Sequence, residues 1–206
     1  MRFRNSVLAG LTLSALVIFL TFGTILVSFW GLLISLVPVL AIYGYAAIRK
    51  TQPETTEDAL ILHRGMKWGL ALGGGWVLTA LTNLIPQPGV LAAVFLPFLV
   101  GALGAIRTGR VSTGTREGFW AGMVGGLMGF LALAAAGYLR AWSSDVGVLA
   151  FMDADEYGAL QLAMYTLIFY GPIFCPLAAL IGGWVGIQLE KTGRVRDREG
   201  IRDANS

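Results

Sequence analysis

Charged side chains are scarce in this chain. Only 13% of its 206 residues are Asp, Glu, Lys or Arg, whereas 56% are hydrophobic. Average soluble proteins carry about 25% charged residues, so too few charges are present here to cover a water-exposed surface. The composition excludes an ordinary soluble domain and favours an all-α integral membrane protein.

Cysteine and histidine occur once each, as Cys175 and His63. A lone cysteine excludes an intrachain disulfide, and a lone histidine excludes a bis-histidine haem site built by one chain. The sequence contains no Walker pattern and no glycine-rich dinucleotide fingerprint. The acids Asp153, Asp155 and Glu156 lack the glycine and the distant glutamate of an EF-hand. We therefore expect no cofactor and no metal site.

Long apolar stretches alternate with short polar segments. Residues 5–48 contain no charge, and as one helix they would extend about 66 Å, roughly twice a ~30 Å hydrocarbon core. We therefore expect a hairpin here, with residues 7–27 as an uncleaved span rather than a signal peptide. The expected domain covers residues 1–189 and is followed by a short basic cytoplasmic tail at 190–206. Its predicted spans are about 6–27, 31–48, 67–85, 90–106, 118–139 and 159–189.

The basic residues predict the orientation of these spans. Fourteen of the fifteen fall in segments on one side, and Arg140 alone falls on the other. Cytoplasmic segments of membrane proteins carry the excess of Lys and Arg. We therefore predict a six-transmembrane-helix bundle of three helical hairpins in the cytoplasmic membrane, with both termini cytoplasmic. Short basic clusters at span ends indicate contact with anionic lipid headgroups rather than nucleic acid. The expected lipid-contacting residues are Arg49, Lys50, Arg107, Arg110, Lys191 and Arg194.

The ends of the fourth and sixth predicted spans are alike in sequence. R-T-G-R-V at 107–111 parallels K-T-G-R-V at 191–195, and R-E-G follows each of them, at 116–118 and 198–200. One interpretation is tandem duplication of a two-helix unit. The other is convergence, because a helix leaving the membrane favours glycine and basic residues at its end. The sequence leaves both interpretations open.

Glycine is abundant, with 28 residues in 206, against a usual ~7%. Lipid tails are as apolar as leucine, so helices in a bilayer associate where small residues allow close backbone approach. We expect three glycine runs to form the tightest helix crossings, within this chain or with a partner subunit. The three runs are Gly65, Gly69 and Gly73; Gly118, Gly122 and Gly126; and Gly182, Gly183 and Gly186.

No ionisable residue lies at the centre of a predicted span, which argues against proton-coupled transport and intramembrane hydrolysis. The sixth span has two prolines four residues apart, and each removes a backbone donor and disturbs the preceding turn. The pattern predicts either a structural kink or a pocket for a small hydrophobic ligand or a lipid. The candidate residues are Pro172, Cys175, Pro176, Tyr165, Tyr170 and Asn83.

These observations favour a non-catalytic membrane subunit with a structural, anchoring or assembly role, whose partners are the bilayer and other membrane subunits. An embedded enzyme ranks behind it, because no nucleophilic or charged cluster shares one depth. The size, six spans, cytoplasmic termini and glycine-rich helices are similar to those of the substrate-binding subunits of energy-coupling-factor transporters. That resemblance implies a solute-binding component as the alternative. The family's Ala-x-x-x-Ala pattern is not kept by Ala9, Gly10 and Ala15, so no residue role is transferred.

Overall fold

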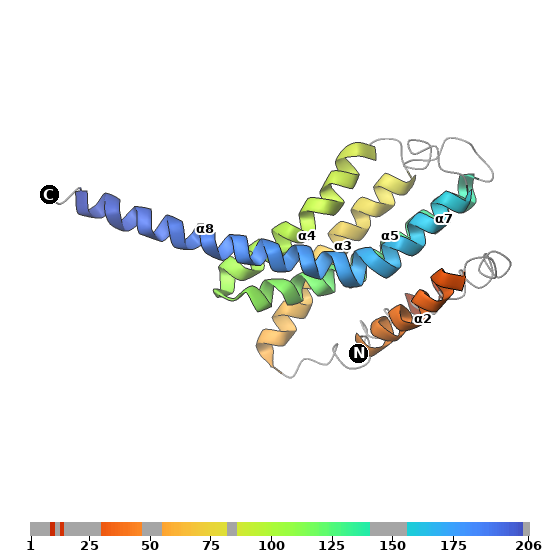
Figure 1. The fold of residues 1–206 in the computed structure, drawn as a ribbon, viewed down its shortest axis with the longest axis horizontal. Coiled ribbons are helices and arrows are strands. Elements are labelled where there is room, and N and C mark those ends of the chain that lie inside the picture. The colour runs from red at the N-terminus through yellow and green to blue at the C-terminus, as the bar shows by residue number, and fades with distance from the viewer. Residues whose placement is uncertain are drawn as a thin grey trace.

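The computed structural model describes residues 9–10, 13–14, 30–46, 55–81, 86–140 and 156–203, and within these ranges every regular element is helical (Figure 1). The elements are α2 (Trp30–Tyr45), α3 (Thr56–Leu81), α4 (Pro86–Thr108), α5 (Val111–Arg140), α7 (Glu156–Tyr165), the π-helix η2 (Thr166–Phe174) and α8 (Cys175–Asp203). The last three of these follow one another without a break, and α8 extends beyond the other helices toward the C-terminus.

Three stretches of helix are long and apolar enough to cross a membrane. They are Leu91–Thr108 in α4, Val111–Ala136 in α5, and Gln161–Thr192, which runs from α7 through η2 into α8. α2 has only 16 residues, and α3 has acidic residues in its first turn. The described part of the chain is therefore all-helical and contains three candidate membrane-spanning helices.

Two helices begin earlier than the sequence predicts. α3 begins at Thr56 instead of residue 67, because Thr55 caps it: the Asp58 N–H donates to the Thr55 hydroxyl at 3.1 Å, and that hydroxyl donates to the Asp58 carboxylate at 2.9 Å. The bond from the Asp58 N–H to the Thr55 hydroxyl is an N-cap. α4 begins at Pro86 instead of residue 90. Proline is tolerated in the first helical turn, because a backbone N–H at that position has no partner within the helix.

Only Gly109 and Arg110 separate α4 from α5, where the sequence suggested a loop over residues 107–116. Gly109 has a φ of +68°, and its N–H donates to the Ala105 carbonyl at 2.8 Å. A left-handed glycine that bonds back to the last helical turn is a common helix C-terminus. Because this turn is so short, α5 begins at Val111 and includes Glu117.

α5 is the central helix of the bundle. It contacts α3, α4, α7, η2 and α8. Its candidate span is more buried than those of α4 and α7–α8. Its Phe130 and Leu133 are fully buried and belong to a core that also includes Tyr43 of α2 and Leu167 of η2.

Contacts at glycines give the relative direction of neighbouring helices. Along the α3–α5 contact the residue numbers rise together on both helices, so these two helices are parallel. The contacting pairs are Gly65 with Trp120, Gly69 with Val124 and Gly73 with Met128. α4 and α8 are also parallel, because Gly182 meets Phe98, Gly183 meets Gly101 and Gly186 meets Ala102.

α5 is antiparallel to both α4 and α8. Gly104 of α4 lies against Gly114 of α5, a few residues from the turn that joins them. Where α5 crosses α8 and η2, the numbers rise on one helix and fall on the other. The contacting pairs are Gly118 with Ala179, Gly122 with Cys175 and Gly126 with Gly171. α3 and α5 therefore run one way through the bundle, and α4 and α8 run the other way.

We predict that Gly101→Ala destabilises the protein far more than Gly74→Ala. A methyl group at Gly101 would collide with the Ala179 backbone of α8, which cannot rotate away, whereas nothing lies within 4 Å of a Cβ at Gly74. We expect Gly101→Ala to lower the free energy of unfolding by about 2–3 kcal/mol. Gly74→Ala should change it by no more than about 1 kcal/mol. Titration of the purified protein with a denaturing detergent measures both, and equal values would contradict the glycine contact.

Candidate functional site

All nine glycines of the three predicted runs lie at contacts between helices. The α3 run faces α5, the α5 run faces α8 and η2, and the α8 run faces α4. A Cβ at Gly65 would lie 2.6 Å from the Trp120 Cβ, and one at Gly186 would lie 2.9 Å from the Ala102 carbonyl oxygen. Both distances are shorter than van der Waals contact, so these helices approach as closely as they do because no side chain intervenes.

Further glycines belong to the same contacts and were not singled out from the sequence, among them Gly101, Gly104 and Gly114. Gly101 and Gly104 lie on the α5 and α8 side of α4, and Gly114 of α5 meets both of them. The spacing of three between Gly101 and Gly104 differs from the spacing of four in the glycine runs of α3 and α5. Gly114 lay in the expected loop, so no helix face was assigned to it.

The sixth predicted span contains a π-helix at its two prolines. Pro172 lies inside η2 and Pro176 follows it. Neither has an N–H, so the ordinary four-residue bonds cannot form there. The helix widens instead, and the Cys175 N–H donates to the Tyr170 carbonyl, five residues earlier.

The widened turn brings the backbone of η2 against α5. Pro176 cannot donate to the Gly171 carbonyl, and this carbonyl lies against Gly122, where a Cβ would collide with its oxygen. Gly171 in turn leaves room for the Tyr43 hydroxyl, which would lie 2.6 Å from a Cβ at that position. The η2 segment, α5 and α2 therefore meet at two glycines, Gly122 and Gly171.

Polar groups of the predicted pocket separate into buried and exposed positions. The Tyr170 hydroxyl donates to the Ala93 carbonyl at 2.7 Å, and Cys175 is fully buried. Tyr165 is 43% exposed and packs beside Phe169, outside this contact. Asn83 lies outside the described residues. The buried Tyr43 hydroxyl has no hydrogen-bond partner among the described residues.

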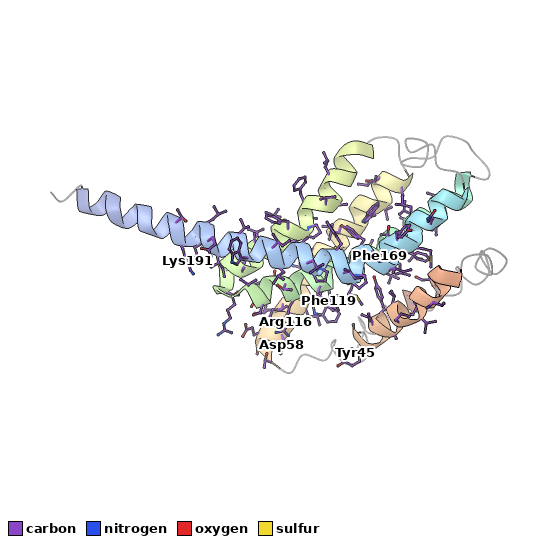
Figure 2. The ribbon with its side chains drawn as sticks, in the orientation of Figure 1. Tyr45, Asp58, Arg116, Phe119, Phe169 and Lys191 are labelled. Atoms are coloured by element: carbon purple, nitrogen blue, oxygen red, sulfur yellow. The ribbon has the colours of Figure 1, made fainter. Side chains whose placement is uncertain are left out.

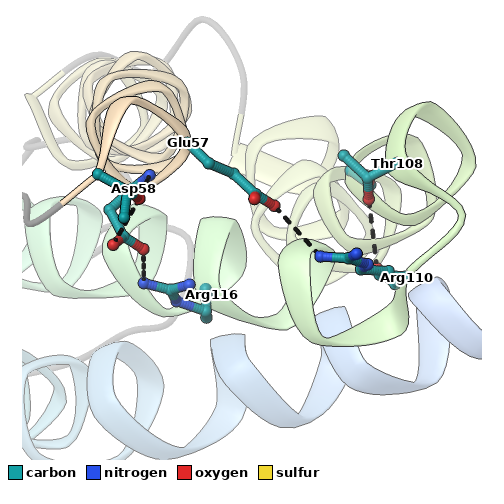
Figure 3. Close-up of polar contacts among 7 residues, drawn as sticks. Glu57, Asp58, Thr108, Arg110 and Arg116 are labelled. Carbon is teal, nitrogen blue, oxygen red and sulfur yellow. Dashed lines mark hydrogen bonds and ion pairs between the residues drawn. The ribbon is translucent and has the colours of Figure 1, made fainter.

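Ion pairs fasten the start of α3 to the α4–α5 turn and the first turns of α5. Arg116 pairs with Asp58, and Arg110 lies 3.8 Å from Glu57 (Figure 3). Figure 2 shows Asp58 and Arg116 together below α5, at the same end of the bundle as Lys191. The Arg110–Glu57 pair is more than half exposed on both sides, so it contributes less than about 1 kcal/mol.

The described cations among the expected lipid contacts gather at this end. Arg107 and Arg110 flank the α4–α5 turn, and Lys191 is exposed on the parallel helix α8. α8 also includes Arg194. Arg49 and Lys50 lie outside the described residues. Arg140 ends α5 and therefore lies at the opposite end of that helix.

Glu117 is the ionisable residue that sequence reasoning missed. Its side chain is fully buried, and neither carboxylate oxygen has a hydrogen-bond partner among the described residues. The Arg64 guanidinium lies 3.6 Å away and is 37% exposed. Glu117 lay between the expected loop and the predicted span at 118–139, so its burial followed only from the two-residue turn that places it inside α5.

Glycine also makes room for this carboxylate. A Cβ at Gly104 of α4 would lie 3.0 Å from a Glu117 carboxylate oxygen, and one at Gly65 of α3 would lie 2.8 Å from the Glu117 backbone carbonyl. Three helices therefore close around Glu117. An ionised side chain in such a place needs a nearby opposite charge, which Arg64 supplies. No group of three or more metal-ligating side chains occurs in the described ranges.

Comparison of the chain with protein-family models, with curated proteins and with solved structures finds no match. The residues and contacts described above are therefore the basis for assigning a function.

We predict that Arg64→Gln destabilises the protein more than Glu117→Gln. Removing Arg64 leaves a buried carboxylate without its nearest counter-charge, and we expect a loss of about 3 kcal/mol in the free energy of unfolding. Removing the Glu117 charge leaves Arg64 able to reach water, so we expect a loss of less than about 1 kcal/mol. Unfolding titrations of both variants test this order, and a larger effect for Glu117→Gln would contradict it.

Proposed function

We propose that this chain is a multi-pass protein of the cytoplasmic membrane with six spans and both termini in the cytoplasm. Three candidate spans are present in the described residues. The parallel pairs α3–α5 and α4–α8 agree with the alternation of odd and even spans that the topology requires. Arg64, Arg107 and Arg116 gather at one end of the bundle, which agrees with a cytoplasmic face rich in basic residues.

Its role in the membrane, in this proposal, is that of a non-catalytic structural, anchoring or assembly subunit. The observation that carries it is the apolar outer face of a bundle with a glycine-packed centre. On α8, large apolar side chains are 45–61% exposed at one side of the helix, and the opposite side is packed through glycine. The exposed side chains are Leu177, Leu180, Ile181 and Trp184. Such a face suits lipid or the helices of another membrane chain.

A second candidate function is solute binding within a transporter. The buried Tyr43 hydroxyl, which has no hydrogen-bond partner among the described residues, favours it. This group lies beside Gly126 and Gly171, next to the η2 segment. A buried polar group without a partner is uncommon in folded proteins, and a bound polar molecule is one way to satisfy it.

The proposed topology predicts opposite labelling of Ser112→Cys and Gly147→Cys. Ser112 is exposed in the first turn of α5, and Gly147 follows the other end of that helix. In intact cells, a membrane-impermeant maleimide should label Gly147→Cys and should label Ser112→Cys only after the membrane is opened. Cys175 is fully buried and provides a silent background. Labelling of both positions from the same side would contradict six spans.

Purification in mild detergent followed by native mass analysis tests the role. The assembly function predicts that stable partner chains remain with the protein, and the solute-binding function predicts a bound small molecule. A Tyr43→Phe variant should lose the small molecule, because the hydroxyl is removed and the ring is kept. A lone chain without ligand would contradict both functions.

A further inference from the structure

The cations at the basic end of the bundle differ in how fully they are neutralised. Arg116 and Arg110 each have an acidic partner in the first turn of α3. Arg64 and Arg107 instead act on one carboxylate, that of Glu117. Two guanidinium groups against one carboxylate leave a local net charge of +1 where α3, α4 and α5 meet.

Both guanidinium groups of this trio are open to the surface. Arg64 is 37% exposed along its side chain, and Arg107 is exposed. Glu117 lies beneath them and is fully buried. A guanidinium has five N–H donors in a rigid fork, and a single ion pair at 3.6 Å leaves most donors of Arg64 unused. Among the residues that the structure describes, Arg107 forms no ion pair.

An apolar stripe on α4 leads to this cationic end. Leu or Phe occupies every fourth position from Leu91 to Leu103, and such a row forms a ridge inclined to the helix axis. Leu91, Phe95 and Leu99 are 58%, 64% and 45% exposed, and the stripe continues through Leu103 to Arg107. The surface therefore combines a long apolar strip with a positive group at its end.

We propose that Arg64 and Arg107 bind the phosphate of an anionic phospholipid whose acyl chain lies along the α4 stripe. Arginine is well suited to a phosphate, because its fork matches two phosphate oxygens at once. A zwitterionic lipid brings its own cation to the site, whereas an anionic lipid neutralises the remaining positive charge. The inference rests on the proposed membrane location and names one lipid class at one place on the bundle.

Glu117 acts here as a positioning residue. It lies beside Gly104 of α4 and forms the ion pair with Arg64 of α3, so it places the Arg64 guanidinium next to the end of α4 that carries Arg107. It also balances one of the two charges, which limits the repulsion between Arg64 and Arg107 when no lipid is bound. The phosphate binds above Glu117, on the exposed side of the arginines.

Lipid selectivity of the full chain tests the proposal. The wild-type protein is first extracted with alkaline carbonate to establish that it stays in the membrane. The purified protein is then titrated with phosphatidylglycerol, phosphatidylcholine or inorganic phosphate, and the rise in its thermal midpoint gives an apparent affinity for each. Three variants are compared with the wild type: Arg107→Gln, Arg107→Lys and, as a matched exposed cation with its own acid, Arg110→Gln.

We expect phosphatidylglycerol to bind more tightly than phosphatidylcholine, and Arg107→Gln to weaken its binding about fivefold. Arg107→Lys should retain part of that affinity. Arg110→Gln should weaken binding much less than Arg107→Gln does, because Glu57 already balances the Arg110 charge. An equal loss in Arg110→Gln would overturn the site in favour of diffuse charge attraction. Inorganic phosphate binding as tightly as phosphatidylglycerol would overturn the assignment to a lipid.

The two proposals fail in different ways. Release of the protein by carbonate contradicts the membrane location itself. Retention in the membrane without a preference for phosphatidylglycerol contradicts only the lipid site.

Discussion

Close backbone contact at glycine positions is the constraint on which the rest of the bundle depends. α5 meets α3 on one side and α8 with η2 on another, and at Gly69, Gly118 and Gly122 a methyl group would collide with the facing helix. A bilayer supplies no hydrophobic force between helices, so the attraction must come from dispersion over many short contacts. Each glycine lets two helices approach closely and so adds to the number of short contacts between them. Together the glycines determine which helix faces meet.

The glycine contacts also explain how a charge is accommodated inside α5. Gly65 and Gly104 bring α3 and α4 so near to Glu117 that water is excluded from its carboxylate. Arg64 then compensates the charge from the partly exposed edge of the bundle. The ion pairs of Asp58 and Glu57 secure the start of α3 beside this point. Packing and electrostatics therefore act on the same end of the molecule, where the basic residues gather.

The π-helix η2 also determines where neighbouring helices meet. A regular helix would carry its carbonyls along its own axis, but two prolines leave some of them without a donor. The π-helix widens the turn, and the Gly171 carbonyl lies against Gly122 of the central helix. Tyr43 reaches the same place from α2, so one irregular turn joins three helices. The proposed membrane role draws on this arrangement, since the close inner contacts leave the large apolar side chains on the outside.

The helical class, the candidate spans at 90–106 and 118–139, and the disturbance near Pro172 could be predicted from the sequence, because hydropathy and proline act locally. The six-span topology stays a prediction, as does the duplication. Helix neighbours and directions could not be predicted, because they depend on residues far apart in the chain, such as Gly101 and Ala179. The burial of Glu117 followed from a two-residue turn, because this turn lets α5 begin at Val111 and so places Glu117 inside a helix. The position of each apolar stretch can be read from local composition alone. Which charge is enclosed depends on tertiary contacts, since the burial of Glu117 requires three helices to meet.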